Sequence, residues 1–228
     1  MFGRGKSYYA LGAYPMLIAA GAVAWEAWSG KRHWIRYVMC ILIIGFTCLI
    51  FPLLLPVYQP EKLAAFNKRH DFKHKWEDQQ YHELSQDFAD MLGWKELTEK
   101  TERFFNSLPD SSKANTTIFC SNYGQAGALQ FYGKETYFKD KVISTNGSFL
   151  LWIPGRLQMK HLIFIDREIP AQAHEFFTHF ATGRTIDSVT NHLSRQMGDK
   201  IFYFENLDTD GSKLINERFK EMKKEFNR

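Results

Sequence analysis

The sequence predicts a small three-layer α/β domain with a mainly parallel sheet, preceded by a hairpin of two transmembrane helices. Three observations lead to this prediction. Residues 37–58 contain no charged side chain, residues 8–24 form a second uncharged run, and the rest of the chain alternates β-prone with helical runs. We therefore expect two transmembrane helices in residues 1–58, a juxtamembrane helix and connection in residues 59–93, and a soluble domain in residues 94–228.

The two uncharged runs differ in length and composition. The second, YVMCILIIGFTCLIFPLLLPVY, has 22 residues, which at 1.5 Å of helix rise per residue matches a hydrocarbon core of about 30 Å. The first contains Gly12, Pro15 and Gly21, which suit a helix packed against other helices. We expect transmembrane helices over about residues 8–28 and 36–58.

A cleaved signal peptide is the alternative for the first run. Arg4 and Lys6 precede it, and the sequence AVA at residues 22–24 has a small-x-small cleavage pattern. Against this alternative, a stronger apolar run follows after a short polar link at residues 29–36. That link is richer in basic residues than the N-terminus, so the positive-inside rule places it in the cytoplasm and the long tail outside.

Charge is distributed unevenly along the chain. The net charge is +4, and residues 1–58 supply all of it with five basic and one acidic side chain, while residues 59–228 carry 24 of each. An electroneutral domain argues against a nucleic-acid partner and leaves the lipid bilayer as the partner that composition indicates. The three cysteines, Cys40, Cys48 and Cys120, do not form a disulfide framework.

The soluble part shows a change of hydrophobic period. Apolar residues recur at helical spacing over residues 94–108, and Pro109 ends this pattern. Short β-prone runs follow, alternating with helical segments. The predicted strands are residues 116–120, 141–144, 161–165 and 201–204, and the predicted helices are residues 124–132, 170–180 and 212–226.

The segment SNYGQAGAL, residues 121–129, follows one predicted strand and opens a helix. We expect Gly124 to let the chain turn out of the strand and Gly127 to let the helix pack close to the sheet. Asn122 and Tyr123 then lie at the carboxyl end of the strand. Asn146 follows the next strand, so both loops point to one ligand crevice. The structural alternative is that both asparagines cap helices.

Other candidate motifs carry less weight. Residues 206–217 resemble a calcium-binding EF-hand loop, but position 1 is Asn206 and a strand precedes it, so we prefer a turn in which Asp208 or Asp210 caps the last helix. His174 and His179 are five residues apart and cannot grip one metal from a helix. No nucleophile has a recognisable triad partner. The sequence therefore predicts no catalytic residue, no metal and no cofactor.

The N-terminal segment combines cations with phenols beside the first apolar run. Lys6, Tyr8 and Tyr9 are at the level expected for lipid headgroups, where they are suited to binding a phosphate. The alternative is that they only anchor the helix end.

Four segments, taken in order, resemble the C-terminal part of bacterial family-39 glycosyltransferases, membrane enzymes similar to dolichyl-phosphate-mannose protein mannosyltransferases and aminoarabinose transferases. They are GKSYYALGAYPMLIAAGAVAWE, LSQDFADMLGWKELTEKTERFFNSLP, SNYGQAGALQFYG and VISTNGSFLLWIPG. The resemblance covers nearly the whole chain.

This resemblance implies an inner-membrane, multi-pass location, with the α/β domain outside the cytoplasmic membrane. It implies transfer of a sugar from a polyprenyl-phosphate carrier to an acceptor, with Lys6, Tyr8 and Tyr9 near the carrier phosphate. The family's catalytic acid lies in an N-terminal loop that has no counterpart here. We therefore expect a fragment that is inactive alone, with a separate N-terminal membrane portion as a candidate partner. The alternative is a membrane-anchored extracytoplasmic α/β ligand-binding module.

Overall fold

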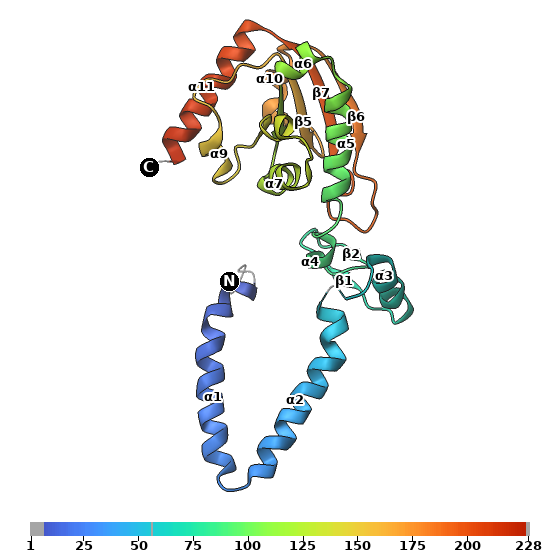
Figure 1. The fold of residues 1–228 in the computed structure, drawn as a ribbon, viewed down its shortest axis with the longest axis vertical. Coiled ribbons are helices and arrows are strands. Elements are labelled where there is room, and N and C mark those ends of the chain that lie inside the picture. Colours follow the sequence, from blue (N-terminus) through green and yellow to red (C-terminus); the bar gives the residue numbers. More distant parts are fainter. Residues whose placement is uncertain (1–6, 56, 227–228) are drawn as a thin grey trace. The chain divides into compact units, whose positions relative to one another are not determined.

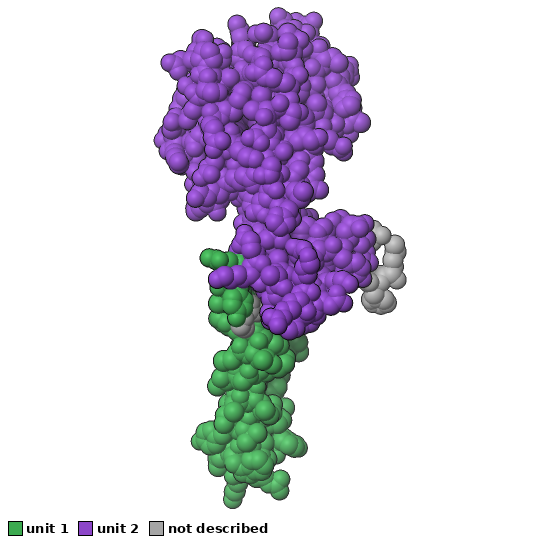
Figure 2. Space-filling model, turned by 90° about the vertical axis from the view of Figure 1, so that its right-hand side faces the viewer, with its two compact units in different colours: residues 1–59 green, residues 60–228 purple. Residues whose placement is uncertain are grey.

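The computed structural model describes residues 7–55 and 57–226. It divides into two compact units, residues 1–59 and residues 60–228, which Figure 2 colours separately. Each unit is described by itself below.

The first unit consists of two long apolar helices, α1 (Tyr14–Ser29) and α2 (His33–Leu54), after the 3-10 helix η1 (Ser7–Ala13). The stretches Ala10–Ser29 and His33–Phe51 have mean hydropathies of 1.3 and 2.2 and are long enough to cross a membrane. Within these two stretches no apolar side chain is buried, an arrangement that is unfavourable in water and expected in lipid.

A tight turn joins the two helices. Gly30 has φ +50°, a backbone conformation that glycine adopts without strain. Arg36 closes this turn, because its Nε donates to Ser29 Oγ at 2.8 Å and its Nη2 donates to the Gly30 carbonyl at 2.9 Å. These contacts explain how the short polar link reverses the chain.

The second unit begins with a small subassembly. It contains α3 (Pro60–Arg69), the two-stranded antiparallel hairpin of β1 (His74–Lys75) and β2 (Tyr81–His82), and α4 (Gln86–Ala89). Leu63 and Ala64 of α3 pack with Leu84 and with Leu193, which comes from a much later loop. Residues 60–93 therefore pack against a loop of the α/β domain in the same unit.

The main sheet has five strands in the order β4-β3-β5-β7-β6. Their bounds are β3 (Thr116–Cys120), β4 (Val142–Ile143), β5 (His161–Asp166), β6 (Phe180–Ser188) and β7 (Lys200–Leu207). The pairs β3–β4 and β3–β5 are parallel, whereas β5–β7 and β6–β7 are antiparallel. The sheet is thus mixed, and the expectation of a mainly parallel sheet was wrong for its second half.

Helices cover both faces of this sheet (Figure 1). Strand side chains alternate between the faces, as the period of two requires. Ile163 and Ile165 of β5 pack with α5 (Trp94–Ser107) and α7 (Tyr123–Tyr132), while Leu162 and Phe164 pack on the opposite side. That second face carries α9 (Phe149–Trp152), α10 (His174–Phe177) and α11 (Thr209–Phe226). The short helices α6 (Asp110–Ala114), α8 (Thr136–Lys139) and η2 (Ala171–Ala173) lie in the connections.

One predicted element differs in kind from the structure. The helix expected over residues 170–180 is limited to η2 and α10, because the chain enters β6 at Phe180. Strand β6 was not predicted, since Ala181 to Thr185 are exposed and show no apolar alternation. It is an edge strand that pairs with β7 on one side, and only its ends contribute to the core, through Phe180 and Ile186.

Candidate functional site

The parallel half of the sheet places three strand ends at one edge. Strand β3 lies between β4 and β5, so the chain leaves β3 toward one side and later returns to the other. This reversal of direction is where open α/β sheets bind ligands, beyond the carboxyl ends of the strands. Ser121 follows β3, Thr145 follows β4, and Arg167 follows β5.

Asn122 begins α7 with a reciprocal cap. Its Oδ1 accepts the backbone N–H of Gln125 at 2.9 Å, and Gln125 Oε1 accepts the backbone N–H of Asn122 at 3.4 Å. This arrangement satisfies two donors of the helix start and removes both from ligand binding. The capping alternative is therefore the one found for Asn122.

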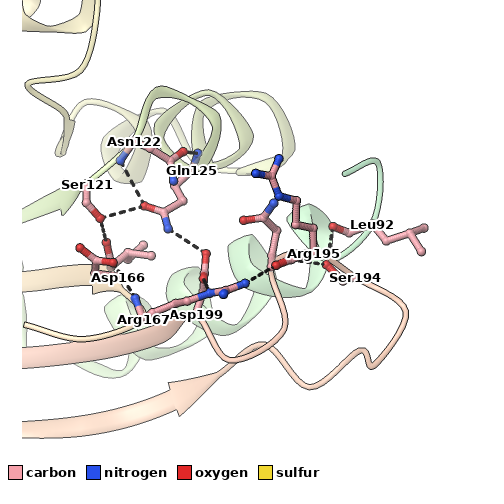
Figure 3. Close-up of polar contacts among 11 residues, drawn as sticks. Leu92, Ser121, Asn122, Gln125, Asp166, Arg167, Ser194, Arg195 and Asp199 are labelled. Atoms are coloured by element: carbon pink, nitrogen blue, oxygen red, sulfur yellow. Dashed lines mark hydrogen bonds and ion pairs between the residues drawn. The ribbon is translucent and has the colours of Figure 1, made fainter. Parts of the chain in front are cut away.

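A polar cluster extends from this cap across the sheet edge (Figure 3). Gln125 Nε2 donates to Asp199 Oδ2 at 2.8 Å, and Arg167 Nε lies 3.3 Å from Asp199 Oδ1. Arg167 also donates from Nη2 to the Arg195 carbonyl. The Asp199 carboxylate thereby joins helix α7 to the end of β5 and the start of β7.

Asp199 is buried, with 4% of its surface exposed. Burial raises the pKa of its carboxyl, and the hydrogen bonds from Gln125 and Arg167 oppose that effect. Such a residue is suited to holding three segments together. Because its oxygens are already engaged, it is poorly placed to act on a substrate.

Arg195 carries the same network to the subassembly that opens the unit. Its Nη1 lies 2.9 Å from Asp90 Oδ2 and its Nη2 lies 3.2 Å from Glu77 Oε2. The neighbouring Ser194 Oγ donates to the Leu92 carbonyl at 2.8 Å. The loop of residues 189–199 is therefore a brace between residues 77–92 and the sheet.

A large apolar pocket lies on the sheet face that α10 and α11 cover. Its volume is about 470 Å³, which falls in the range of small-molecule sites. Its walls are formed by apolar side chains of β3, β4, β5, α10 and α11. Among them are Phe119, Ile143, Phe164, Phe177, Ile215 and Phe219. The pocket reaches the carboxyl edge of the sheet at Ser121 and Thr145, which also line it.

Few polar groups reach this pocket. Ser121 Oγ donates to the Ile165 carbonyl at 2.8 Å, so its proton is already engaged. Gln172, Glu175 and Arg218 line the pocket but are exposed, which places their polar ends toward solvent. A ligand here meets hydrocarbon inside and a hydroxyl, a carboxylate and a guanidinium at the edge.

The two predicted glycine roles are wrong in detail. Gly124 is the second residue of α7 rather than a turn residue, and a Cβ on it would lie 2.9 Å from Cη2 of Trp94. It permits α5 and α7 to approach closely. A Cβ on Gly127 would meet no atom within 4 Å, so this glycine does not serve close packing.

The remaining predicted crevice residues do not converge on one ligand position. The Tyr123 side chain is 65% exposed, and Asn146 is exposed while its backbone N–H donates to Ser144 Oγ at 3.2 Å. Neither residue lines the pocket, whereas their neighbours Ser121 and Thr145 do. The two loops meet one site, but through residues that the sequence did not single out.

The proposed phosphate-binding residues are at the N-terminus. Lys6 lies outside the described residues. Tyr8 and Tyr9 fall in η1, for which only the backbone is described. Their role stays a prediction.

The calcium-like segment forms a strand end and a helix cap. Asn206 belongs to β7, and Asp208 Oδ1 accepts the Gly211 N–H at 2.7 Å at the start of α11. The Asp208 carboxylate also lies 3.0 Å from His179 Nδ1, and the hydrogen bond from Gly211 and the one from His179 lower the pKa of Asp208. Among the described residues, no group of three or more His, Cys, Asp or Glu side chains is placed to hold a metal.

Sequence reasoning missed Asp199, Arg167 and the pocket walls. Asp199 lies 74 residues beyond Gln125 and stands in a polar loop with no motif around it. The pocket is assembled from short pieces of five elements, each of which looks like ordinary core. One signal is present in the sequence of α11, where Leu214, Ile215, Phe219 and Met222 recur at helical spacing and all line the pocket.

Comparison of the chain with protein-family profiles, curated proteins and solved structures finds no match.

Proposed function

We propose that this chain forms the C-terminal membrane helices and the extracytoplasmic domain of a polyprenyl-phosphate-sugar-dependent glycosyltransferase of the inner membrane. In this proposal the soluble unit binds the acceptor. One observation carries it. Two of the segments that resemble family-39 enzymes, SNYGQAGALQFYG and VISTNGSFLLWIPG, supply Ser121, Ile143 and Thr145 to the same pocket.

The chemistry of the pocket favours the apolar part of an acceptor over its sugar. A sugar hydroxyl that is buried without a hydrogen-bond partner costs about 1–3 kcal/mol, and the pocket interior offers few partners. A hydrocarbon chain gains about 0.8 kcal/mol for each buried CH₂ group. We therefore assign the pocket to the apolar portion of a lipid-like acceptor, with its polar group near Glu175 and Arg218.

The apolar helices support the membrane part of the proposal. A Cβ on Gly12 or Gly21 would have no atom of the described chain within 4 Å, so the small residues of the first run are open to further helices. In the proposal, these helices come from the rest of a multi-pass enzyme, and Lys6 with Tyr8 and Tyr9 holds the carrier phosphate. Spheroplast protection checks the sidedness, because protease added outside should digest residues 60–228 and spare α1 and α2.

Sugar transfer tests the proposal directly. Membranes lacking this chain are compared with membranes in which it is restored, using a carrier labelled in its sugar. Wild type should restore transfer to the acceptor. Ala173→Phe, which places a ring in the pocket, should lower transfer about tenfold, as expected from a loss of about 1.4 kcal/mol of binding. Ala181→Phe, on exposed β6 outside the pocket, is the matched control. Equal transfer with and without the chain would contradict the proposal.

A membrane-anchored binding module is the second candidate, and the same pocket favours it. It predicts that a ligand raises the melting temperature of the purified chain, because binding to the folded state alone stabilises it. Under this candidate, Ala173→Phe abolishes the ligand-dependent shift, while sugar transfer never depends on the chain. The two assays together separate the candidates.

A further inference from the structure

Charge within the soluble unit is divided between its first residues and the rest. Residues 60–75 contain five basic and two acidic side chains, a net charge of +3 with neutral histidine. Residues 76–228 contain 19 basic and 22 acidic side chains, a net charge of −3. The two charges cancel over the whole unit, but residues 60–75 form a basic segment shortly after the second apolar helix.

Helix α3 presents this charge on one face. Leu63, Ala64 and Asn67 are buried against the subassembly. Lys62, Phe66 and Arg69 follow one another at four- and three-residue spacing on the opposite side. The Phe66 side chain is 41% exposed. The outer face of α3 thus carries an aromatic ring between two cations.

The aromatic surface continues past the end of the helix. Asp71 has φ +53° and turns the chain, and Phe72, 47% exposed, follows it. The Phe66 and His70 ring centroids are 4.5 Å apart, and those of Phe66 and Phe72 are 6.2 Å apart. Exposed aromatic rings beside cations are typical of protein surfaces that lie at a membrane interface.

The cations of this segment are largely uncompensated. Lys73 Nζ pairs with Asp71 Oδ1 at 2.9 Å. Among the described contacts, no ion pair joins the other four, which are Lys62, Lys68, Arg69 and Lys75. A pocket of about 380 Å³ lies beside them, lined by Lys68, Lys73, Trp76 and His192 with the acidic Asp71 and Glu83.

Chain connectivity limits where this surface is found. Five residues separate the end of α2 at Leu54 from the start of α3 at Pro60. Such a connection spans at most about 20 Å, so a bilayer that holds α2 also keeps α3 near its surface. The partner nearest to this basic and aromatic face is therefore lipid.

We propose that residues 60–75 form a docking surface for anionic phospholipid, in the bilayer that holds α1 and α2. Lys62 and Arg69 contact headgroup phosphates, and Phe66 and Phe72 enter the interface. This surface fixes the soluble unit at the membrane independently of the pocket and of any transferase activity. We expect each cation to raise the ratio of membrane-bound to free soluble unit about fivefold at an anionic surface.

The test uses the full chain in lipid nanodiscs with a spin label at Ala65→Cys, a position on the exposed side of α3. Cys40 and Cys48 are replaced by alanine, and Cys120 is buried and does not react. Collisions of the label with oxygen and with a water-soluble nickel complex report whether it lies in the interface. A label at Lys220→Cys on α11 is the reference for a position in water.

The proposal predicts interfacial contact of the α3 label in discs of phosphatidylglycerol, with little contact in phosphatidylcholine and loss of contact at high salt. Lys62→Gln with Arg69→Gln should lower the bound-to-free ratio about 25-fold. The matched pair Lys220→Gln with Lys224→Gln should leave it unchanged. Equal label environments in the two lipids would overturn the proposal. So would displacement by millimolar glycerol phosphate, which would indicate a site for a free phosphate instead.

Discussion

Gln125 forms hydrogen bonds with both Asn122 and Asp199: its backbone N–H donates to Asn122 Oδ1, and its side chain donates to the buried Asp199 carboxylate. The segment that marks the start of α7 in the sequence is thereby connected to a loop 74 residues later. The SNYGQAGAL segment is therefore a structural joint of the α/β domain. Ser121, the first residue of this segment, also lines the apolar pocket.

Replacing this joint should destabilise the soluble unit. Gln125→Met keeps the side-chain volume and removes the side-chain hydrogen bonds with Asp199, Asn122 and Ser121, so that the Asp199 carboxylate keeps its contact with Arg167. We expect a loss of about 2 kcal/mol in the free energy of unfolding, because a buried charged acceptor loses a partner. Urea unfolding of the detergent-solubilised chain, followed by near-ultraviolet circular dichroism, measures this loss. Gln130→Met on the same helix should change the free energy by less than about 0.5 kcal/mol, and equal effects of the two variants would contradict the assignment.

Two carboxyl groups should affect acid stability with opposite signs. Burial would raise the pKa of Glu96, but hydrogen bonds from Lys100, Thr190 and Asn191 hold it at about 2, below its ordinary 4.5. Its ionised form therefore stabilises the fold above pH 4.5, and this contribution is lost as the pH falls toward 2. The pKa of Asp199 is raised, so its contribution to stability declines as the pH rises above 3.8.

Stability curves from pH 2 to pH 7 test these signs. Glu96→Gln should be less stable than wild type at pH 7 by about 1 kcal/mol, a value discounted because a quarter of its side chain is exposed to solvent. The difference should shrink as the pH falls toward 2. Asp199→Asn should instead lose less stability than wild type on going from pH 3 to pH 6. Parallel curves for all three proteins would refute the assigned pKa directions.

The two glycines of α7 should respond oppositely to alanine. Gly127→Ala should stabilise the unit by about 1 kcal/mol, because the added Cβ meets open space and alanine favours the helix. Gly124→Ala should destabilise it by about 1–3 kcal/mol, since the Cβ would press on Trp94, whose Nε1 is held by the Asp90 carbonyl. Thermal melts of the two variants provide the comparison. Stabilisation by both substitutions would contradict this prediction, because it would show that the Trp94 side chain can move away from the added Cβ at little cost.

Asp208 should act as a helix cap without calcium. Asp208→Ala removes the acceptor of the Gly211 N–H and should lower the melting temperature of the soluble unit. Addition of millimolar calcium should leave the melting temperature of wild type and variant unchanged. A calcium-dependent rise in wild type that Asp208→Ala abolishes would restore the metal-binding interpretation.

The sequence predicts well those elements whose apolar residues are periodic. The spacing from Trp94 to Leu108 matches α5, and the β-branched runs match β3 and β5. It fails for β6, because an exposed edge strand is held by backbone hydrogen bonds that leave no hydrophobic pattern. It also placed antiparallel β7 in a parallel sheet, since strand direction depends on the connection and not on the strand residues.

The candidate site was predictable only in part. The edge of the sheet followed from the strand-to-helix order around Asn122 and Asn146. The residues that line the pocket did not, because Phe177 and Ile215 belong to separate segments whose proximity is set by the packing of α10 and α11. The polar Asn122, which stands out in the sequence, caps a helix, whereas apolar side chains from five separate elements form most of the cavity wall.

The brace formed by Ser194 and Arg195 has a consequence for biogenesis. Asp90 and Leu92 emerge from the ribosome about a hundred residues before the partners that secure them. Residues 90–92 therefore remain incompletely packed while about a hundred further residues are made. A product that ends before residue 194 would lack these contacts, and we expect cellular proteases to degrade it faster than the full chain.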